Sequence, residues 1–406
     1  MFEGFRNWFA ERRNFLFSWY TKDAKETQEP ERSLIKLPPE IRRKVVKMVE
    51  QLPSNSADRE AIVSALDESF EIWHQDPSNA NNSIVILSSP VAAVSRIISE
   101  SLEEWTQQKQ LPTVMLPLTA RPLEIESIKS KLEYHLEPKS TEDDSQADRL
   151  EVVVIPNLSW CFLRSLEGLS GIEYLQSLLC DGSKNRFWII GGGQVGWEYL
   201  NSVCNLEAYC GKTFVLPKVT SEELQEWLEP IVKELEITFG KPRIQKQILE
   251  QDLDPKTHYF EVLADVSEGI SVVAVQGFLK SLYSQEETEE ETEEETGEEE
   301  TIEKGEETTD DNESTVIAQT PELPEIPDLE SVDQYILYSL LLHGDLTLSA
   351  LAASLGDDRS EVQPRIQMLR RQGVIEQKDK ILKINPIHYP KLKRQLANNN
   401  FIINKE

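Results

Sequence analysis

Signatures that would identify a function directly are scarce in this 406-residue sequence. Its four cysteines lie in apolar stretches without a CxxC pair, and its five histidines are scattered, so we expect neither a zinc site nor a disulfide framework. The sequence lacks an apolar run of about 18 residues that could span a bilayer. The first 20 residues lack the continuous apolar segment of a secretory signal. These absences predict a cytoplasmic protein that is not exported.

Acidic charge is abundant but concentrated in one segment. The formal net charge is −30, and residues 286–313 contain 17 acidic side chains against Lys304 alone. Residues 331–406 contain 11 basic and 8 acidic side chains, so the C-terminal region is mildly basic. The low isoelectric point therefore describes the acidic segment and says little about the regions on either side.

The acidic run should separate two folded regions. Its Glu and Thr residues cannot bury apolar surface and repel one another, which predicts an extended, disordered linker. The following TPELPEIPDLE is punctuated by prolines and should also be extended. The sequence then divides into an amphipathic N-terminal segment (1–25), a helical lead-in (26–57), a large domain (58–283), an acidic linker (284–328) and a C-terminal module (329–406).

The C-terminal module has the pattern of a winged helix. Apolar residues recur at helical spacing over 332–343, then from Thr347 to Gly356, and again from Ser360 to Gln372, with Gly373 as the last cap. The segments VIEQ and ILKIN, separated by a KDK turn, predict two short strands. Three helices followed by a β-hairpin make a winged helix.

The large domain alternates between apolar strands and amphipathic helices. Such alternation predicts an α/β fold, a parallel sheet with helices on both faces. The expected strands are 83–89, 112–118, 150–156, 186–191 and 213–217. The preceding helix at 37–53 is bounded by prolines and should pack against this domain.

The order of these elements resembles a known family. The segments RFWIIGGGQVGWEYL and FVLPKVTSEELQEWL, followed by YFEVLADVSEGISVVAVQGFLKSLY as a helical lid, are similar to AAA+-type P-loop ATPases of the STAND kind. The resemblance covers residues 58–283, and a winged helix is common in that group. It implies a P-loop NTPase-like sheet with a lid and ATP-dependent switching between conformations.

The phosphate-binding loop of that family is altered here. A working loop needs glycines so that backbone N–H groups can wrap the phosphates, a lysine to neutralise them and a hydroxyl for Mg²⁺. In the matching segment SSPVAAVS, the glycine positions hold Ser88, Val91 and Ala93, the lysine position holds Val94, and Ser95 alone matches. The side chains should intrude where phosphate oxygens would approach.

The hydrolytic positions are altered as well. The resemblance places acidic residues at the end of the strand LEVVVIP, where this chain has Pro156 and Asn157; a proline side chain cannot ligate a metal, and an asparagine is a poor base. The polar sensor position falls within Gly191–Gly193, with Gln194 nearest. The triplet ending in Gly193 is better explained as a tight strand-to-helix turn than as a phosphate cradle. We therefore expect a noncatalytic pseudo-ATPase without a cofactor.

Two further surfaces suggest partners. The third helix and the hairpin turn of the winged helix carry basic side chains that could meet DNA phosphates or a protein. We favour a protein because the charge is modest and the acidic linker would compete. The basic residues are Arg359, Arg365, Arg370, Arg371, Lys378 and Lys380.

The N-terminal segment is aromatic and basic. Its apolar residues fall near one helical face, so this segment could lie in the interface of the inner membrane leaflet or pack on protein. The residues concerned are Phe2, Phe5, Phe9, Leu16 and Trp19.

Taken together, the sequence predicts a noncatalytic regulatory or scaffolding protein that acts through protein contacts. Two alternatives remain. One is an ATP-binding STAND-type switch with an unusual P-loop, the reading in which ATP and Mg²⁺ would bind. The other is a DNA-associated regulator.

Overall fold

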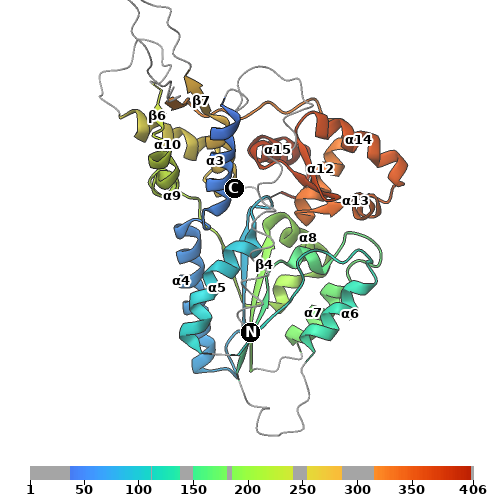
Figure 1. The fold of residues 1–406 in the computed structure, drawn as a ribbon. Helices are drawn as coiled ribbons and strands as arrows, with labels where there is room; N and C mark the ends of the chain where they lie inside the picture. The colour runs from blue at the N-terminus through green and yellow to red at the C-terminus, as the bar shows by residue number, and fades with distance from the viewer. Residues whose placement is uncertain are drawn as a thin grey trace, which may run out of the picture.

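The chain forms three packed parts in a computed structural model (Figure 1). The structure describes residues 37–110, 112–137, 150–180, 185–240, 254–285 and 315–403. We call the parts the body, the lid and the C-terminal module. The body carries the large sheet, the lid packs beside the carboxyl end of that sheet, and the C-terminal module covers the same end from the other side.

The body is built on a five-stranded parallel sheet with the order β2-β3-β4-β1-β5. Neighbours β1 and β4 are distant in sequence, so the chain crosses over between them. The strands are β1 (Ser83–Ser88), β2 (Thr113–Met115), β3 (Glu151–Ile155), β4 (Arg186–Gly193) and β5 (Lys212–Val215). The predicted α/β class, with a parallel sheet and helices on both faces, is confirmed.

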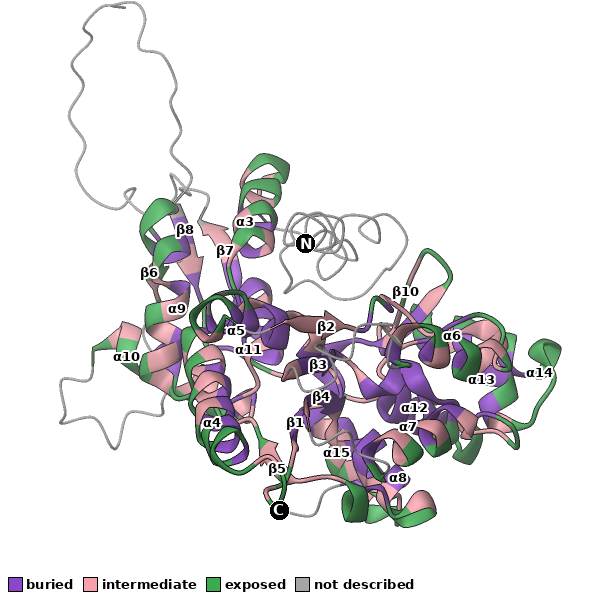
Figure 2. Ribbon diagram, turned by 90° about the horizontal axis from the view of Figure 1, so that it is seen from below, coloured by how far each residue is buried: buried purple, intermediate pink, exposed green. Residues whose placement is uncertain are grey.

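Helices cover both faces of this sheet because its strands are apolar on both sides. In β1, Ile84 and Ile86 face one core, and Val85 and Leu87 face the other. Figure 2 shows β1, β3 and β4 as largely buried strands within the body. The first face is covered by α4 (Ser56–Gln75) and α5 (Val94–Lys109). The second is covered by α6 (Ser127–Leu136), α7 (Ser170–Cys180) and α8 (Gln194–Cys204), with the short 3₁₀ turns η4 (Leu158–Cys161) and η5 (Leu206–Tyr209).

The lid extends beyond the helical segment that the sequence predicts. It contains α9 (Ser221–Glu234), α10 (Pro255–Val266), α11 (Ser271–Lys280) and a small sheet of order β6-β8-β7. It also contains α3 (Pro39–Gln51), whose buried Val45, Val46 and Val49 join the lid core. The helix therefore packs on the large domain, as predicted, and its apolar stripe meets α9 of the lid.

The acidic linker is shorter than predicted. The lid strand β7 (Leu282–Gln285) pairs antiparallel with β8 (Thr315–Ala318), and β8 also pairs in parallel with β6 (Thr238–Phe239). Both ends of the acidic run therefore belong to one sheet of the lid, and residues 286–314 lie outside the described residues. The β-branched TVIA segment explains the correction, since it favours a strand and buries Val316.

Residues 319–330, which we call the strap, run from the lid to the C-terminal module. The sequence repeats every three residues here: three prolines (321, 324 and 327), three aliphatic residues (323, 326 and 329) and three exposed acids (322, 325 and 328). Ile326 and Leu329 pack against the core, while Lys391 Nζ lies 3.2 Å from Leu323 O and 2.6 Å from Glu325. The strap is extended as predicted, but it is packed on the protein.

The C-terminal module has the predicted order of elements. The helix α12 (Ser331–His343) precedes α13 (Leu348–Leu355) and α14 (Arg359–Arg371), and a sheet of order β10-β11-β9 completes the module. Thr347 caps α13 through its side chain, and Gly356 and Gly373 end helices at positive φ. The strands are β9 (Leu346–Thr347), β10 (Ile375–Lys378) and β11 (Ile381–Ile384), followed by η6 (Pro386–His388) and α15 (Tyr389–Asn398), which the sequence did not predict.

Within the described ranges, no helix combines the length and the apolar character needed to cross a membrane.

Candidate functional site

The C-terminal module shares one continuous hydrophobic core with the body. Side chains of α12, such as Ile336 and Leu340, belong to the same cluster as Trp197 of α8 and Val85 of β1. Helices α12 and α8 pack so closely that a Cβ on Gly196 would lie 2.6 Å from Leu342 O. The module is therefore docked on the body, and the expected separation by a flexible linker does not hold.

Arg121 joins the body to the end of α12. Its guanidinium donates to Phe162 O (2.8 Å) and Ser159 O in the body and to Asp345 O (2.8 Å) beyond α12. Burial lowers the pKa of Arg121 to about 10, which leaves it protonated at neutral pH. A cation at a helix C-terminus satisfies carbonyl groups that lack intrahelical partners.

Arg164 makes a second link of the same kind. It donates from Nη2 to Ser354 O (3.0 Å) near the end of α13, while its backbone N–H donates to Nε2 of His343 (3.2 Å). His343 is fully buried, and burial lowers its pKa well below the usual value. The neutral imidazole can accept that hydrogen bond. Two arginines of the body thus hold two helix ends of the module.

The lid also contacts the C-terminal module. The buried Gln276 of α11 accepts a hydrogen bond from Ile387 N (3.0 Å). Glu268, in the turn after α10, pairs with Arg394 (2.9 Å) and Lys393 (3.6 Å) of α15. Body, lid and module are therefore all in contact at the carboxyl end of the parallel sheet.

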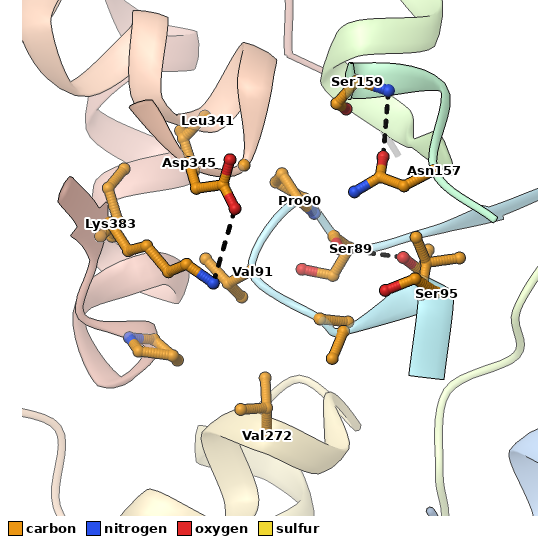
Figure 3. Close-up of a pocket in the computed structure, with 18 of the residues that line it drawn as sticks. Ser89, Pro90, Val91, Ser95, Asn157, Ser159, Val272, Leu341, Asp345 and Lys383 are labelled. Carbon is orange, nitrogen blue, oxygen red and sulfur yellow. Dashed lines mark hydrogen bonds and ion pairs between the residues drawn. The ribbon is translucent and has the colours of Figure 1, made fainter. Parts of the chain in front are cut away.

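A cavity of about 150 Å³ lies where these three parts meet. The carboxyl ends of β1, β3 and β4 place the residues of the predicted degenerate nucleotide site together there. Figure 3 shows part of this wall, with Lys383 and Asp345 of the module facing the loop after β1. The body residues that line the cavity include Ser88, Val91, Ala93, Val94, Ser95, Asn157 and Gly193, and Pro156 lies next to Asn157.

The loop after β1 makes two hydrogen bonds within itself, although Ser89 Oγ is buried without a hydrogen-bond partner. Ala92 N donates to Ser89 O (3.0 Å), and Ser88 Oγ donates to the same oxygen (3.1 Å). Val94 is 3% exposed and belongs to the core beneath α4 and α5, while Val91 packs on the core shared with the module. The loop is thus built from internal hydrogen bonds and apolar contacts.

The position after β3 has a structural use. Asn157 Oδ1 accepts a hydrogen bond from Ser159 N (3.0 Å) and so caps η4. The carbonyl oxygen of Pro156 lies against β4, where a Cβ on Gly191 would approach it to 2.5 Å. Gly193 is the last residue of β4 and the N-cap of α8, so the glycine triplet lies in the strand and does not form the predicted turn. Gln194 lines a neighbouring cavity.

Charges around the cavity balance. Among the described lining residues, three are basic (Arg96, Lys378 and Lys383) and three are acidic (Glu100, Asp345 and Glu376). Arg96, on the first turn of α5, pairs with Glu100 (2.7 Å) and donates to Leu52 O, and Lys383 pairs with Asp345 (3.7 Å). The part of the cavity wall that β10 and β11 form was not predicted from the sequence, because contacts between residues about 290 positions apart leave no local sequence pattern.

A second cavity, of about 330 Å³, lies between the body, the lid and α15. Asp58, near the start of α4, lines it and accepts a hydrogen bond from Ser271 Oγ at the start of α11 (2.9 Å). Burial, with a smaller contribution from Glu223, raises the pKa of Asp58 to about 6. Asp58 thus links body and lid through a carboxyl group that titrates close to neutral pH.

This shift predicts a pH dependence. The folded chain binds the Asp58 proton more tightly than the unfolded chain, where the pKa is about 3.9. The stabilisation from this group is therefore complete below about pH 4 and is lost as pH rises through about 6. Asp58→Asn keeps an acceptor for Ser271, so its urea midpoint should change less than that of the parent between pH 5 and 7.5. Equal changes in both chains would refute this assignment.

The predicted basic face of the module is divided. Arg365 pairs with Glu330 and lies 3.6 Å from Asp333, and Lys378 lines the first cavity. The other members, Arg359, Arg370, Arg371 and Lys380, are exposed. The predicted membrane contacts Phe2, Phe5, Phe9, Leu16 and Trp19 lie outside the described residues.

Comparisons with known proteins find structural likenesses at low sequence identity. No protein-family model and no curated protein matches the sequence. Among solved structures, the chain is similar to the ORC2 protein of Aeropyrum pernix in ADPNP–ADP complexes (TM-score 0.38, 13% identity, 86% of this chain and 95% of that chain). It is also similar to Cdc6p of Pyrobaculum aerophilum (0.38, 12%, 86% and 96%). A third is the RuvB Holliday junction branch migration motor of Thermotoga maritima (0.31, 14%, 85% and 96%).

Likenesses with these TM-scores carry no functional argument. Function is therefore inferred from the residues of this chain's own site.

Proposed function

We propose that this protein is a noncatalytic, AAA+-like scaffold that acts through protein contacts. The observation that carries the proposal is the cavity at the former phosphate position. Its volume of about 150 Å³ is below the roughly 300–1,000 Å³ of typical ligand sites, and strands of the C-terminal module form one of its walls.

The chemistry of the cavity supports the same conclusion. A triphosphate with Mg²⁺ needs free backbone N–H groups, a cation and acidic residues that hold the metal shell. The loop after β1 uses Ala92 N internally, its lysine position is the buried Val94, and Asn157 caps η4. The described lining charges balance, so there is no net positive charge to attract phosphate. These residues do not fit the nucleotide and metal that the family resemblance implies.

An assay of phosphate release from Mg-ATP by the full chain tests the catalytic part of the proposal. We expect release equal to that of a protein-free blank, because Asn157 cannot act as a base. Release that is faster than the blank and disappears in Asn157→Ala would sink the proposal.

The second candidate function is a ligand-responsive switch in which nucleotide binds without a standard P-loop. The second cavity favours it, because about 330 Å³ falls within the size range of ligand sites and touches both body and lid. The hydrogen bond from Ser271 to Asp58 crosses that junction, so a ligand there could alter the angle between body and lid. Binding of Mg-ATP without turnover would favour this candidate over the scaffold.

DNA association through the C-terminal module is supported less well. A winged helix that binds DNA uses a helix together with its wing. Here Arg370 and Arg371 of α14 are exposed, but Lys378 faces the first cavity and Arg365 is paired. A protein partner that binds the exposed face of α14 is more consistent with this separation of the basic side chains.

A further inference from the structure

Two turns of the body share a sequence pattern. Residues 121–124 read RPLE and residues 164–167 read RSLE, so each is an R-x-L-E turn. We call them the twin turns. The first follows β2 and the second follows η4. They are neighbours in space, because Arg121 Nε donates to Phe162 O (2.8 Å), two residues before the second turn.

The arginine of each turn points inward and fixes it. Arg121 donates to carbonyls beyond α12, and Arg164 donates to Ser354 O near the end of α13. The second turn is also closed by backbone hydrogen bonds from Leu163 N to Gly168 O (2.9 Å) and from Gly168 N to Ser165 O (3.3 Å). The backbone of both turns is therefore anchored.

The leucine of each turn points outward. Leu123 is 84% exposed and Leu166 is fully exposed, at 105%. Isolated exposed leucines are ordinary on protein surfaces. Here two exposed leucines lie on neighbouring turns whose backbone is already fixed, so a binding segment would meet a preorganised apolar surface. Glu124, Glu126 and Glu167 are exposed beside them, so the surface is apolar with an acidic border.

We propose that the twin turns dock the chain's own residues 1–25. This segment carries the complementary chemistry, with aromatic side chains such as Phe5 and Phe9 and the basic residues Arg6, Arg12 and Arg13. Residues 26–36 connect it to the described fold at Leu37, and 11 residues can span up to about 36–40 Å. Docking there would cover the leucines until a partner with a similar apolar and basic segment displaces it. The inference does not depend on whether the chain binds nucleotide.

Photocrosslinking in the full chain tests the proposal. Phe9→p-benzoylphenylalanine places a crosslinker in the segment, and mass spectrometry then maps its products. We expect crosslinks to peptides that contain residues 119–126 and 162–169. The double substitution Leu123→Asp and Leu166→Asp should lower their yield about tenfold, because it removes the apolar side chains that the aromatic residues of the segment would contact.

Ile72→Asp serves as the matched control. Ile72 is 59% exposed on α4, so the substitution introduces the same charge elsewhere on the body and should leave the yield unchanged. Crosslinks that map elsewhere, that are absent, or that survive the double substitution would overturn the proposal. A mixture of ¹⁴N- and ¹⁵N-labelled chains separates the sources: mixed-isotope products would mean that a second copy supplies the segment, which overturns docking within one chain.

Discussion

Arg121→Ala should destabilise the folded chain by about 3–5 kcal/mol, the largest effect that we expect from a single substitution. The guanidinium donates to carbonyls of Phe162, Ser159 and Asp345 at the interface between the body and the C-terminal module. Alanine would leave these buried oxygens without their donor and open a void. Urea unfolding of the full chain measures the change.

Arg43→Ala is the matched control for that experiment. Arg43 is exposed on α3 and donates to Pro39 O within its own turn (3.1 Å). A contact of this kind contributes little, so the expected change is within about 0.5 kcal/mol. Similar losses in both variants would show that Arg121 does not hold the interface.

Gly196→Ala should destabilise the chain by about 1–3 kcal/mol, although alanine usually favours a helix. The added Cβ would lie 2.6 Å from Leu342 O, a backbone atom of α12 that cannot rotate away. Helices α8 and α12 would therefore have to move apart. Thermal unfolding should show a lower midpoint.

Gly192→Ala provides the control in the same stretch of chain. A Cβ there would meet Leu87 Cδ2 at 3.6 Å and Leu158 Cβ at 3.7 Å, which are ordinary contacts. The midpoint of this variant should stay close to that of the parent. If both glycine variants behave alike, the close approach of α8 to α12 is not what makes Gly196 necessary.

Local patterns predicted much of the fold. The apolar run at β1 predicted a buried strand, and β1 is buried on both faces. Gly356 and Gly373 were predicted to end helices, and both have positive φ at helix ends. The grouping of Ser88, Asn157 and Gly193 was also predictable, because the carboxyl ends of parallel strands bring them to one edge of the sheet.

Long-range docking could not be predicted in the same way. The acidic run suggested two separate domains, but Val316 returns to the lid sheet and the strap packs against the module. In the strap, aliphatic residues such as Ile326 and Leu329 recur every three positions, which indicates a packed side. The prolines and acidic residues between them made the segment look like an exposed linker. The roles of Arg121 and Arg164 depend on contacts across about 180–225 residues, which single-sequence patterns do not encode.

Isothermal titration of the full chain with Mg-ATP tests the central claim most directly. The account predicts no binding heat at micromolar protein and ligand, because Val94 stands where the family resemblance implies a phosphate-binding lysine and the cavity holds balanced charges in about 150 Å³. Saturable binding with a micromolar Kd would contradict it.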